Sequence, residues 1–132
     1  RSRGLGDVYK RQNYIYVRMG AHTLIHKRTE DDIWKNLFEL PLVETEKDLS
    51  EEEFLACPQF HALFAEGEVR MVRTLLRGVK HVLSHRVIYT NFYEVTLPDN
   101  SSSFSSYQRV AVEDLGRYAV PRLIHAFLEK YV

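Results

Sequence analysis

The chain has few of the residues that would cross-link it covalently or carry it into a membrane. Its single cysteine, Cys57, excludes an internal disulfide and cannot by itself make a cysteine metal site, so we expect it to fill a small space in the core. No apolar run approaches the ~20 residues that a membrane span needs, and no signal-peptide pattern begins the chain. We therefore expect a soluble, cytoplasmic domain.

Acidic residues are missing from residues 69–93, a stretch with a local charge of plus five from Arg70, Arg73, Arg77, Lys80 and Arg86. Residues 30–68 show the reverse, with twelve acids against Lys35 and Lys47. The formal net charge of zero therefore hides a dipolar chain. The basic stretch suits a phosphate-bearing partner, and it is equally typical of solvated residues at the edge of a strand.

The length of 132 residues and the hydrophobic content of 45% fit one globular domain with a real core. Residues 1–12, RSRGLGDVYKRQ, lack hydrophobic periodicity and resemble the translation of a sequencing adapter, so we treat them as a non-native or disordered leader. The domain is then residues 13–132, with a charge of minus three. It is expected to be a piece of a longer protein.

Residues 78–97, GVKHVLSHRVIYTNFYEVTL, form the segment on which the candidate site depends. From Val87 onward, β-branched and aromatic residues alternate with a period of two, which predicts a strand. His81, Ser84 and His85 interrupt this strand-like segment with polar side chains. Residues 69–76 are a second apolar run, and Gly78 is expected to provide the bend between the two runs. A loop held on rigid strands can present Ser84 and His85 to a ligand at low entropic cost.

The first part of the domain has local patterns that predict strands. Residues 14–19 and 22–28 predict a β-hairpin with Gly20 in its turn; His22 and His26 would lie ~13 Å apart on one strand, too far for one metal ion. Residues 29–44 predict a core-forming loop and strand in which Trp34 is a packed anchor and Pro41 marks a sheet edge or bulge.

Residues 50–53, SEEE, predict a helix start with a capping box. The alternative, a Mg²⁺ site made by the three glutamates, is disfavoured because consecutive helical residues point in different directions. Pro58 should end this helix, and another short turn of helix is expected over residues 59–65.

The last third of the chain predicts a polar connector followed by helices. Residues 99–106, DNSSSFSS, have turn chemistry and no evident chemistry of their own. Residues 112–118 begin a helical pattern, and Pro121 is suited to the first position of a final helix. The apolar stripe of that helix should pack on the sheet: Leu123, Ile124, Phe127, Leu128 and Tyr131. Together these elements predict an α/β or α+β fold with a mixed β-sheet flanked by helices.

Three segments of the chain carry a family resemblance: IWKNLFELPLVETE at residues 33–46, HVLSHRVIY at 81–89 and YAVPRLIHAFL at 118–128. In this order they resemble the C-terminal domain of MutY-type A/G-specific adenine DNA glycosylases. The resemblance implies a Nudix-like fold that recognises 8-oxoguanine opposite adenine during base excision repair in bacteria. The implied partners are double-stranded DNA with that mispair and the catalytic domain of the parent chain, and we expect a monomer.

The resemblance also assigns roles around the family's recognition loop, which reads here from His81 to His85. Leu83 stands where the family has Phe and would still wedge beside the lesion. Ser84 would answer the added oxygen and proton of the oxidised base, since a hydroxyl both donates and accepts. His85 would reach the backbone or a base edge. From charge and position alone, Lys80 and Arg86 would lie near phosphates.

Several alternatives stay open beside this interpretation. Ser84 and His85 could simply satisfy a strand-to-strand turn, whereas a Ser-His hydrolase lacks an orienting carboxylate and nucleophile-elbow glycines. The family's glycosylase chemistry needs a helical domain with an iron–sulfur cluster on four cysteines, so this chain should not cleave adenine, and it needs no cofactor of its own. The Nudix pyrophosphatase signature is also incomplete. The main alternative is a stand-alone Nudix-type hydrolase of oxidised nucleotides, and another is an interaction domain without a ligand.

Overall fold

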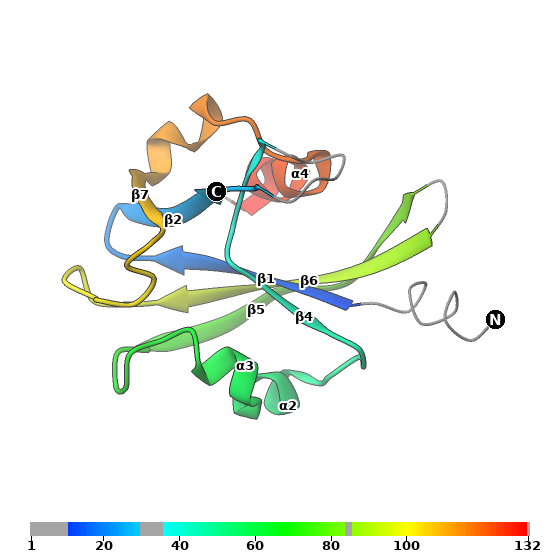
Figure 1. Cartoon of the computed structure of the whole chain (residues 1–132), viewed down its shortest axis with the longest axis horizontal. Helices are drawn as coiled ribbons and strands as arrows, with labels where there is room; N and C mark the ends of the chain where they lie inside the picture. Colours follow the sequence, from blue (N-terminus) through cyan, green and yellow to red (C-terminus); the bar gives the residue numbers. More distant parts are fainter. Residues whose placement is uncertain (1–10, 30–35, 84–85, 132) are drawn as a thin grey trace.

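The computed structural model describes residues 11–29, 36–83 and 86–131, with the side chains of Leu83 and Arg86 left out of the description. Two β-sheets lie between helices (Figure 1). The central sheet has the order β4-β1-β6-β5, from β1 (Arg11–Arg18), β4 (Leu42–Thr45), β5 (Met71–Leu83) and β6 (Arg86–Thr96). The second sheet has the order β3-β2-β7, from β2 (His22–Lys27), β3 (Phe38–Glu39) and β7 (Gln108–Ala111).

The helices cover both faces of the central sheet. Helices α2 (Glu51–Ala56) and α3 (Pro58–His61) lie on one side, and α4 (Arg122–Tyr131) lies with the second sheet on the other (Figure 1). A 3-10 helix, η1 (Val112–Arg117), follows β7. Strand β1 runs parallel to β6, whereas β4 and β5 are antiparallel to their neighbours. The predicted α+β fold with a mixed sheet flanked by helices is therefore confirmed. None of the helices in the described ranges is long and apolar enough to cross a membrane.

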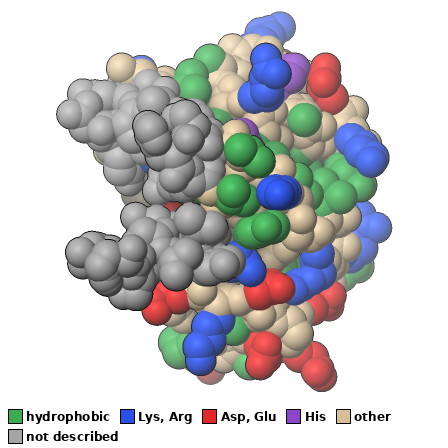
Figure 2. Space-filling model, turned by 90° about the vertical axis from the view of Figure 1, so that its right-hand side faces the viewer, with side chains coloured by type: hydrophobic (Ala, Val, Ile, Leu, Met, Phe, Trp, Pro, Cys, Tyr) green, Lys and Arg blue, Asp and Glu red, His purple; other side chains and the backbone are tan. Residues whose placement is uncertain are grey.

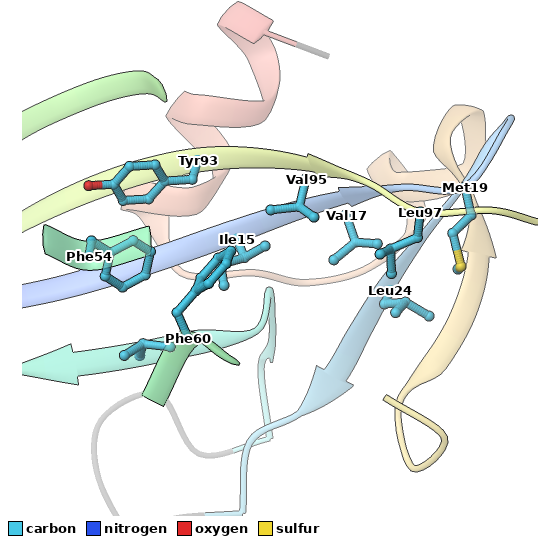
Figure 3. Close-up of a cluster of buried hydrophobic side chains, with 10 residues drawn as sticks. Ile15, Val17, Met19, Leu24, Phe54, Phe60, Tyr93, Val95 and Leu97 are labelled. Atoms are coloured by element: carbon cyan, nitrogen blue, oxygen red, sulfur yellow. The ribbon is translucent and has the colours of Figure 1, made fainter. Parts of the chain in front are cut away.

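Strand alternation on β1 and β6 divides the core into two layers. Ile15, Val17 and Tyr93 face α2 and α3, where the Phe54 ring stacks on Tyr93 at 4.6 Å between centroids (Figure 3). On the opposite face Phe92 stacks on Phe127 of α4 at 4.2 Å. The apolar stripe predicted for the final helix is confirmed: Ile124 and Phe127 are buried, and Leu123, Leu128 and Tyr131 pack around them.

The predicted hairpin of residues 14–28 is wrong in its pairing. The two strands form on either side of the expected turn. Among the described residues, their pairing with each other is limited to a single bridge between Met19 and His22. The two strands belong to different sheets. The physical reason is that residues 12–17 are buried on both faces, as in an interior strand, and β1 pairs with β6 along its whole length and with β4 from Arg11 to Tyr14 on its other edge. Strand β2 therefore pairs elsewhere.

The chain does not turn back at Gly78. Strand β5 continues through this glycine to Leu83, and the reversal lies between Leu83 and Arg86. Gly78 instead sits in a β-bulge, where the register shifts between Leu76 and Val79, with a backbone φ of 68°. A bulge that contains a glycine with positive φ bends a strand without ending it, so the predicted bend at Gly78 lies inside one continuous strand.

Most helix boundaries follow from local signals. The Ser50 side chain accepts from Glu53 N at 3.1 Å while the Glu53 carboxylate accepts from Ser50 N at 2.9 Å, so the predicted capping box is confirmed. Pro58 separates α2 from α3 as predicted. Pro121 precedes the first residue of α4 instead of occupying it, since its carbonyl accepts the first-turn bond from His125 N.

Strand β1 begins at Arg11, two residues before the expected start of the domain at residue 13, and Arg11 and Gln12 pair with Tyr89 and Thr90 of β6. The rest of the predicted leader, residues 1–10, lies outside the described residues, as does Trp34. Pro41 lies between β3 and β4. Each of these strands is at the edge of its sheet, so the predicted edge position of Pro41 is confirmed. Cys57 is half-buried against the core beside α2 and α3.

The serine-rich connector binds a carboxylate. Glu68 accepts from the Ser101 hydroxyl at 2.5 Å, from the Ser103 hydroxyl at 2.8 Å and from Ser102 N at 3.2 Å. These hydrogen bonds, that of Ser101 first, lower the pKa of Glu68 from 4.5 to about 2 because they favour the ionised form. The segment between α3 and β5 is thereby joined to the segment between β6 and β7.

Replacing Glu68 by Gln should make stability less dependent on acid pH. Because the folded-state pKa lies below the ordinary one, the stabilisation by Glu68 is fully present above pH 4.5 and is lost as the pH falls toward 2. We expect the variant to unfold at lower urea than the wild type at pH 7, with the difference shrinking between pH 4.5 and 2.5. Glu66→Gln, at an exposed acid two residues away, is the control. A Glu68→Gln difference that stays constant with pH would refute this assignment.

Candidate functional site

The β5–β6 pair ends in an arm, here defined as residues 79–83 and 86–90. Residues 89 and 90 still pair with β1, whereas residues 81–83 and 86–88 extend past the described part of that strand (Figure 1). The register of the arm pairs Val79 with Thr90 and continues to Leu83 with Arg86. Ser84 and His85, the two central residues of the candidate site, lie outside the described residues. Of Leu83 and Arg86, the structure describes the backbone, at the last and first positions of the two strands. The described residues on either side of the predicted loop thus lie on paired, antiparallel strands.

His81 and Lys80 lie on opposite faces of the arm because strand side chains alternate. Lys80 is exposed and pairs across the strands with Tyr89, whose ring lies 4.5 Å under the Arg11 guanidinium. Next to it Val82 is 66% exposed, an unusual position for a large apolar side chain. Lys and Arg side chains are interspersed with hydrophobic ones where this end of the molecule faces the viewer (Figure 2).

His81 is half-buried and lines a pocket between the arm, the second sheet and the start of α4. The pocket is small, with about 20 Å³ of free volume, which is room for one water molecule and not for a nucleobase. Its wall combines polar and apolar groups: Gln12, Tyr14, Arg28, Glu39, His81, Ile88, Pro121 and Leu123.

A buried carboxylate organises the floor of this pocket. Glu39, whose side chain is 4% exposed, accepts from Arg28 at 2.8 Å and from the Tyr14 hydroxyl at 3.3 Å, and its second oxygen lies 3.1 Å from His26 Nε2. Burial, and then the charge of Glu39, raise the pKa of Tyr14, so its hydroxyl remains a donor. This network, which joins β1, β2 and β3, was missed by sequence reasoning because its members are far apart in the chain.

The basic stretch of residues 69–93 is partly neutralised by pairing. Arg73 contacts Glu94 at 2.6 Å, and Arg77 contacts Asp48 at 3.4 Å and donates to the Leu49 carbonyl at 2.7 Å. Two of the five cations counted from the sequence are thus paired with acids from outside the stretch, which lowers the free positive charge of this region. Two cations of this stretch, Lys80 and Arg86, belong to the arm. The structure describes the side chain of Lys80, which is exposed.

The three glutamates of α2 point in different directions, as expected for consecutive helical residues. Glu53 caps its own helix, Glu51 accepts from the Thr74 hydroxyl of β5, and Glu52 is exposed. Across residues 11–29, 36–83 and 86–131, no three His, Cys, Asp or Glu side chains are gathered in a way that could hold a metal ion. His26 contacts Glu39, whereas His22 is exposed at the start of β2.

Glu39→Leu should lower the free energy of unfolding by about 3 kcal/mol, because it leaves Arg28, itself 10% exposed, without its buried carboxylate. Urea denaturation at pH 7 measures the loss. The matched control is Glu46→Leu, at an exposed acid after β4, which should change stability by less than about 0.5 kcal/mol. Equal losses from the two substitutions would show that the Glu39 network does not hold the sheets together.

Comparisons with known proteins agree with this geometry. Among solved structures, the C-terminal domain of mouse MUTYH, crystallised with human PCNA, matches with a TM-score of 0.68 and 13% identity over 92% of this chain and 86% of that one. A Nudix hydrolase from M. smegmatis, RenU, matches with a TM-score of 0.63 and 11% identity over 95% and 83% of the two chains. The MutT protein from Methanosarcina mazei matches with a TM-score of 0.59 and 18% identity over 92% and 91%.

These identities are low, so the structural matches establish the fold alone. A search of curated protein sequences finds no match. The model of the NUDIX domain family, in contrast, matches residues 13–130, nearly the whole chain. The chain belongs to the NUDIX domain family.

Proposed function

We propose that this chain is a non-catalytic module that reads 8-oxoguanine opposite adenine in double-stranded DNA for an adenine glycosylase. The observation that supports the proposal is the arm, in which the backbones of Leu83 and Arg86, the residues on either side of Ser84 and His85, are paired on adjacent strands. A reading loop must hold its donors and acceptors at fixed positions, and paired strands supply that rigidity. The similarity to the C-terminal domain of mouse MUTYH supports the same assignment at the level of the fold.

On this proposal, different residues at the end of the arm contact different parts of the DNA. Ser84 would donate to the added oxygen at C8 and accept from the proton at N7, the two features that separate the oxidised base from guanine. His85 would hydrogen-bond the backbone or a base edge, and Leu83 would wedge into the stack beside the lesion. Lys80 and Arg86 would contact phosphates on either side, which fixes the register without reading sequence.

The pocket behind the arm is suited to supporting the arm and not to binding a base. Its free volume is too small for a base. On this proposal the lesion is therefore recognised at the tip of the arm and does not bind inside the pocket. His81 on the arm and Glu39 of the buried network line this same pocket, so the pocket would couple the arm to that network. The glycosylase chemistry, with its iron–sulfur cluster, would then reside in a separate catalytic domain, and the partners would meet in the bacterial cytoplasm on DNA.

The double variant Ser84→Ala/His85→Ala tests the proposal. Binding to a fluorescent duplex with 8-oxoguanine opposite adenine is compared with binding to the same duplex with guanine opposite adenine. We expect the wild type to prefer the lesion and the variant to lose about tenfold of that preference, since well-placed base contacts are worth ~1–3 kcal/mol of discrimination. Binding to the undamaged duplex, which rests on phosphate contacts, should change little.

His22→Ala/Ser106→Ala is a matched control, because it removes an exposed histidine and an exposed serine from segments outside the arm. It should leave the preference intact. A wild-type chain that binds both duplexes equally would contradict the proposal and favour an interaction domain without a nucleic-acid ligand.

The second candidate is a stand-alone hydrolase of oxidised nucleotides, which the fold-level similarity to RenU and MutT keeps open. This reading needs a carboxylate cluster for Mg²⁺, whereas Glu51 and Glu53 are engaged by Thr74 and Ser50. Release of pyrophosphate from 8-oxo-deoxyguanosine triphosphate with Mg²⁺ separates the two candidates. The lesion-reading proposal predicts no release above that of an enzyme-free blank, and release that Glu52→Gln abolishes would establish the hydrolase.

A further inference from the structure

The arm begins at the bulge around Gly78, and this bulge is fixed by a side chain from the neighbouring strand. Asn91 of β6 stands opposite two residues of β5, Arg77 and Gly78, between the pairs Leu76 with Phe92 and Val79 with Thr90. The Gly78 backbone N–H, which the bulge takes out of the ladder, donates to Asn91 Oδ1 at 2.7 Å. The glycine has a φ of 68°, and a Cβ at this position would have no heavy atom within 4 Å. The bulge therefore requires glycine for its backbone angle and not for space.

Asn91 is itself held by a chain of amide groups that crosses the whole central sheet. Its Nδ2 donates to Asn13 Oδ1 of β1 at 2.9 Å, and Asn13 Nδ2 donates to the Val43 carbonyl of β4 at 3.0 Å. Asn13 and Asn91 are register partners on adjacent strands and are 2% and 3% exposed. The series Val43, Asn13, Asn91 and Gly78, here called the amide relay, thus has one member on each of the four strands.

Each link of the amide relay constrains the next. A buried amide must satisfy both its donor and its acceptor, so the rotation of Asn13 fixes that of Asn91, and Asn91 Oδ1 then accepts at a fixed point. That point holds the Gly78 N–H, and a bulge sets the local bend and twist of its strand. The direction in which residues 79–83 leave the sheet is consequently determined by side chains outside the arm.

We propose that Asn13, Asn91 and Gly78 are positioning residues that set lesion selectivity by fixing the direction of the arm. The inference rests on the proposed function, because selectivity is meaningful only if the arm reads the lesion. None of the three needs to touch DNA. Their effect is exerted through the backbone of β5, which carries Lys80, His81 and the segment that follows them.

Two variants interrupt the amide relay in different ways. Asn91→Ala removes the acceptor of the Gly78 N–H, and Gly78→Ala keeps that bond but places an L-residue at a positive φ on an exposed position. Val110→Ala, in β7 of the second sheet, is the control, since it removes buried apolar volume without touching the amide relay. If Asn91→Ala fails to fold, Gly78→Ala still tests the inference.

Amide hydrogen exchange by mass spectrometry and the duplex binding assay are measured on the same samples. In Asn91→Ala and Gly78→Ala, peptides covering residues 79–83 should exchange about tenfold faster than in the wild type while β1 and β7 keep their protection. The preference for the 8-oxoguanine duplex should fall about fivefold with binding to the undamaged duplex retained. Val110→Ala should accelerate exchange without a focus on the arm and should keep the preference.

The outcomes separate this inference from the proposed function. A wild type without any preference for the lesion defeats the proposed function, and the inference falls with it. A wild type that prefers the lesion, together with variants that keep the full preference, overturns the inference alone. Faster exchange that Val110→Ala reproduces at residues 79–83, with an equal loss of preference, also overturns it, because the effect would then be one of general stability.

Discussion

The pairing of β1 on both edges is the constraint on which the other features of this molecule depend. Its residues 12–17 are buried on both faces, so the strand must lie inside a sheet and between two layers. β6 pairs along one edge in parallel orientation, and β4 pairs with Arg11–Tyr14 on the other edge in antiparallel orientation. Strand β2 belongs to the second sheet, where it pairs with β3 and β7. The pairing of β1 also brings Asn13 beside Asn91 and Gln12 and Tyr14 into the wall of the pocket.

The arm is a consequence of that same arrangement. Within the described residues β6 pairs with β1 from Tyr89 onward, and residues 86–88 with their partners on β5 extend beyond the described part of β1. The bulge at Gly78 lies inside the sheet, two residue pairs before the projecting part, and it is tied through Asn91 to Asn13 of β1. The described residues that flank the proposed site therefore lie on paired strands, and paired strands are the kind of rigid support that a base-reading loop requires.

Sequence reasoning succeeded where the signal is local and failed where it is not. The capping box at Ser50 and the stripe of α4 involve neighbours within one or two turns, and both were predicted. The pairing of β1 was mistaken because Gly20 in a short turn suggests a hairpin, and only the burial of both faces reveals an interior strand. The Glu39 network and the ion pairs of Arg73 with Glu94 and of Arg77 with Asp48 join residues far apart in the chain. No local sequence pattern predicts such contacts. The assignment of Ser84 and His85 remains a prediction.

Backbone resonances of the ¹⁵N-labelled chain test the central claim most directly, because they report which amides sense the lesion. The chain is titrated with a duplex carrying 8-oxoguanine opposite adenine and with the same duplex carrying guanine. The account predicts that the difference between the two titrations is concentrated at residues 79–90. Identical titrations, or a lesion-dependent difference centred on residues 51–61 of the two helices across the sheet, would contradict it.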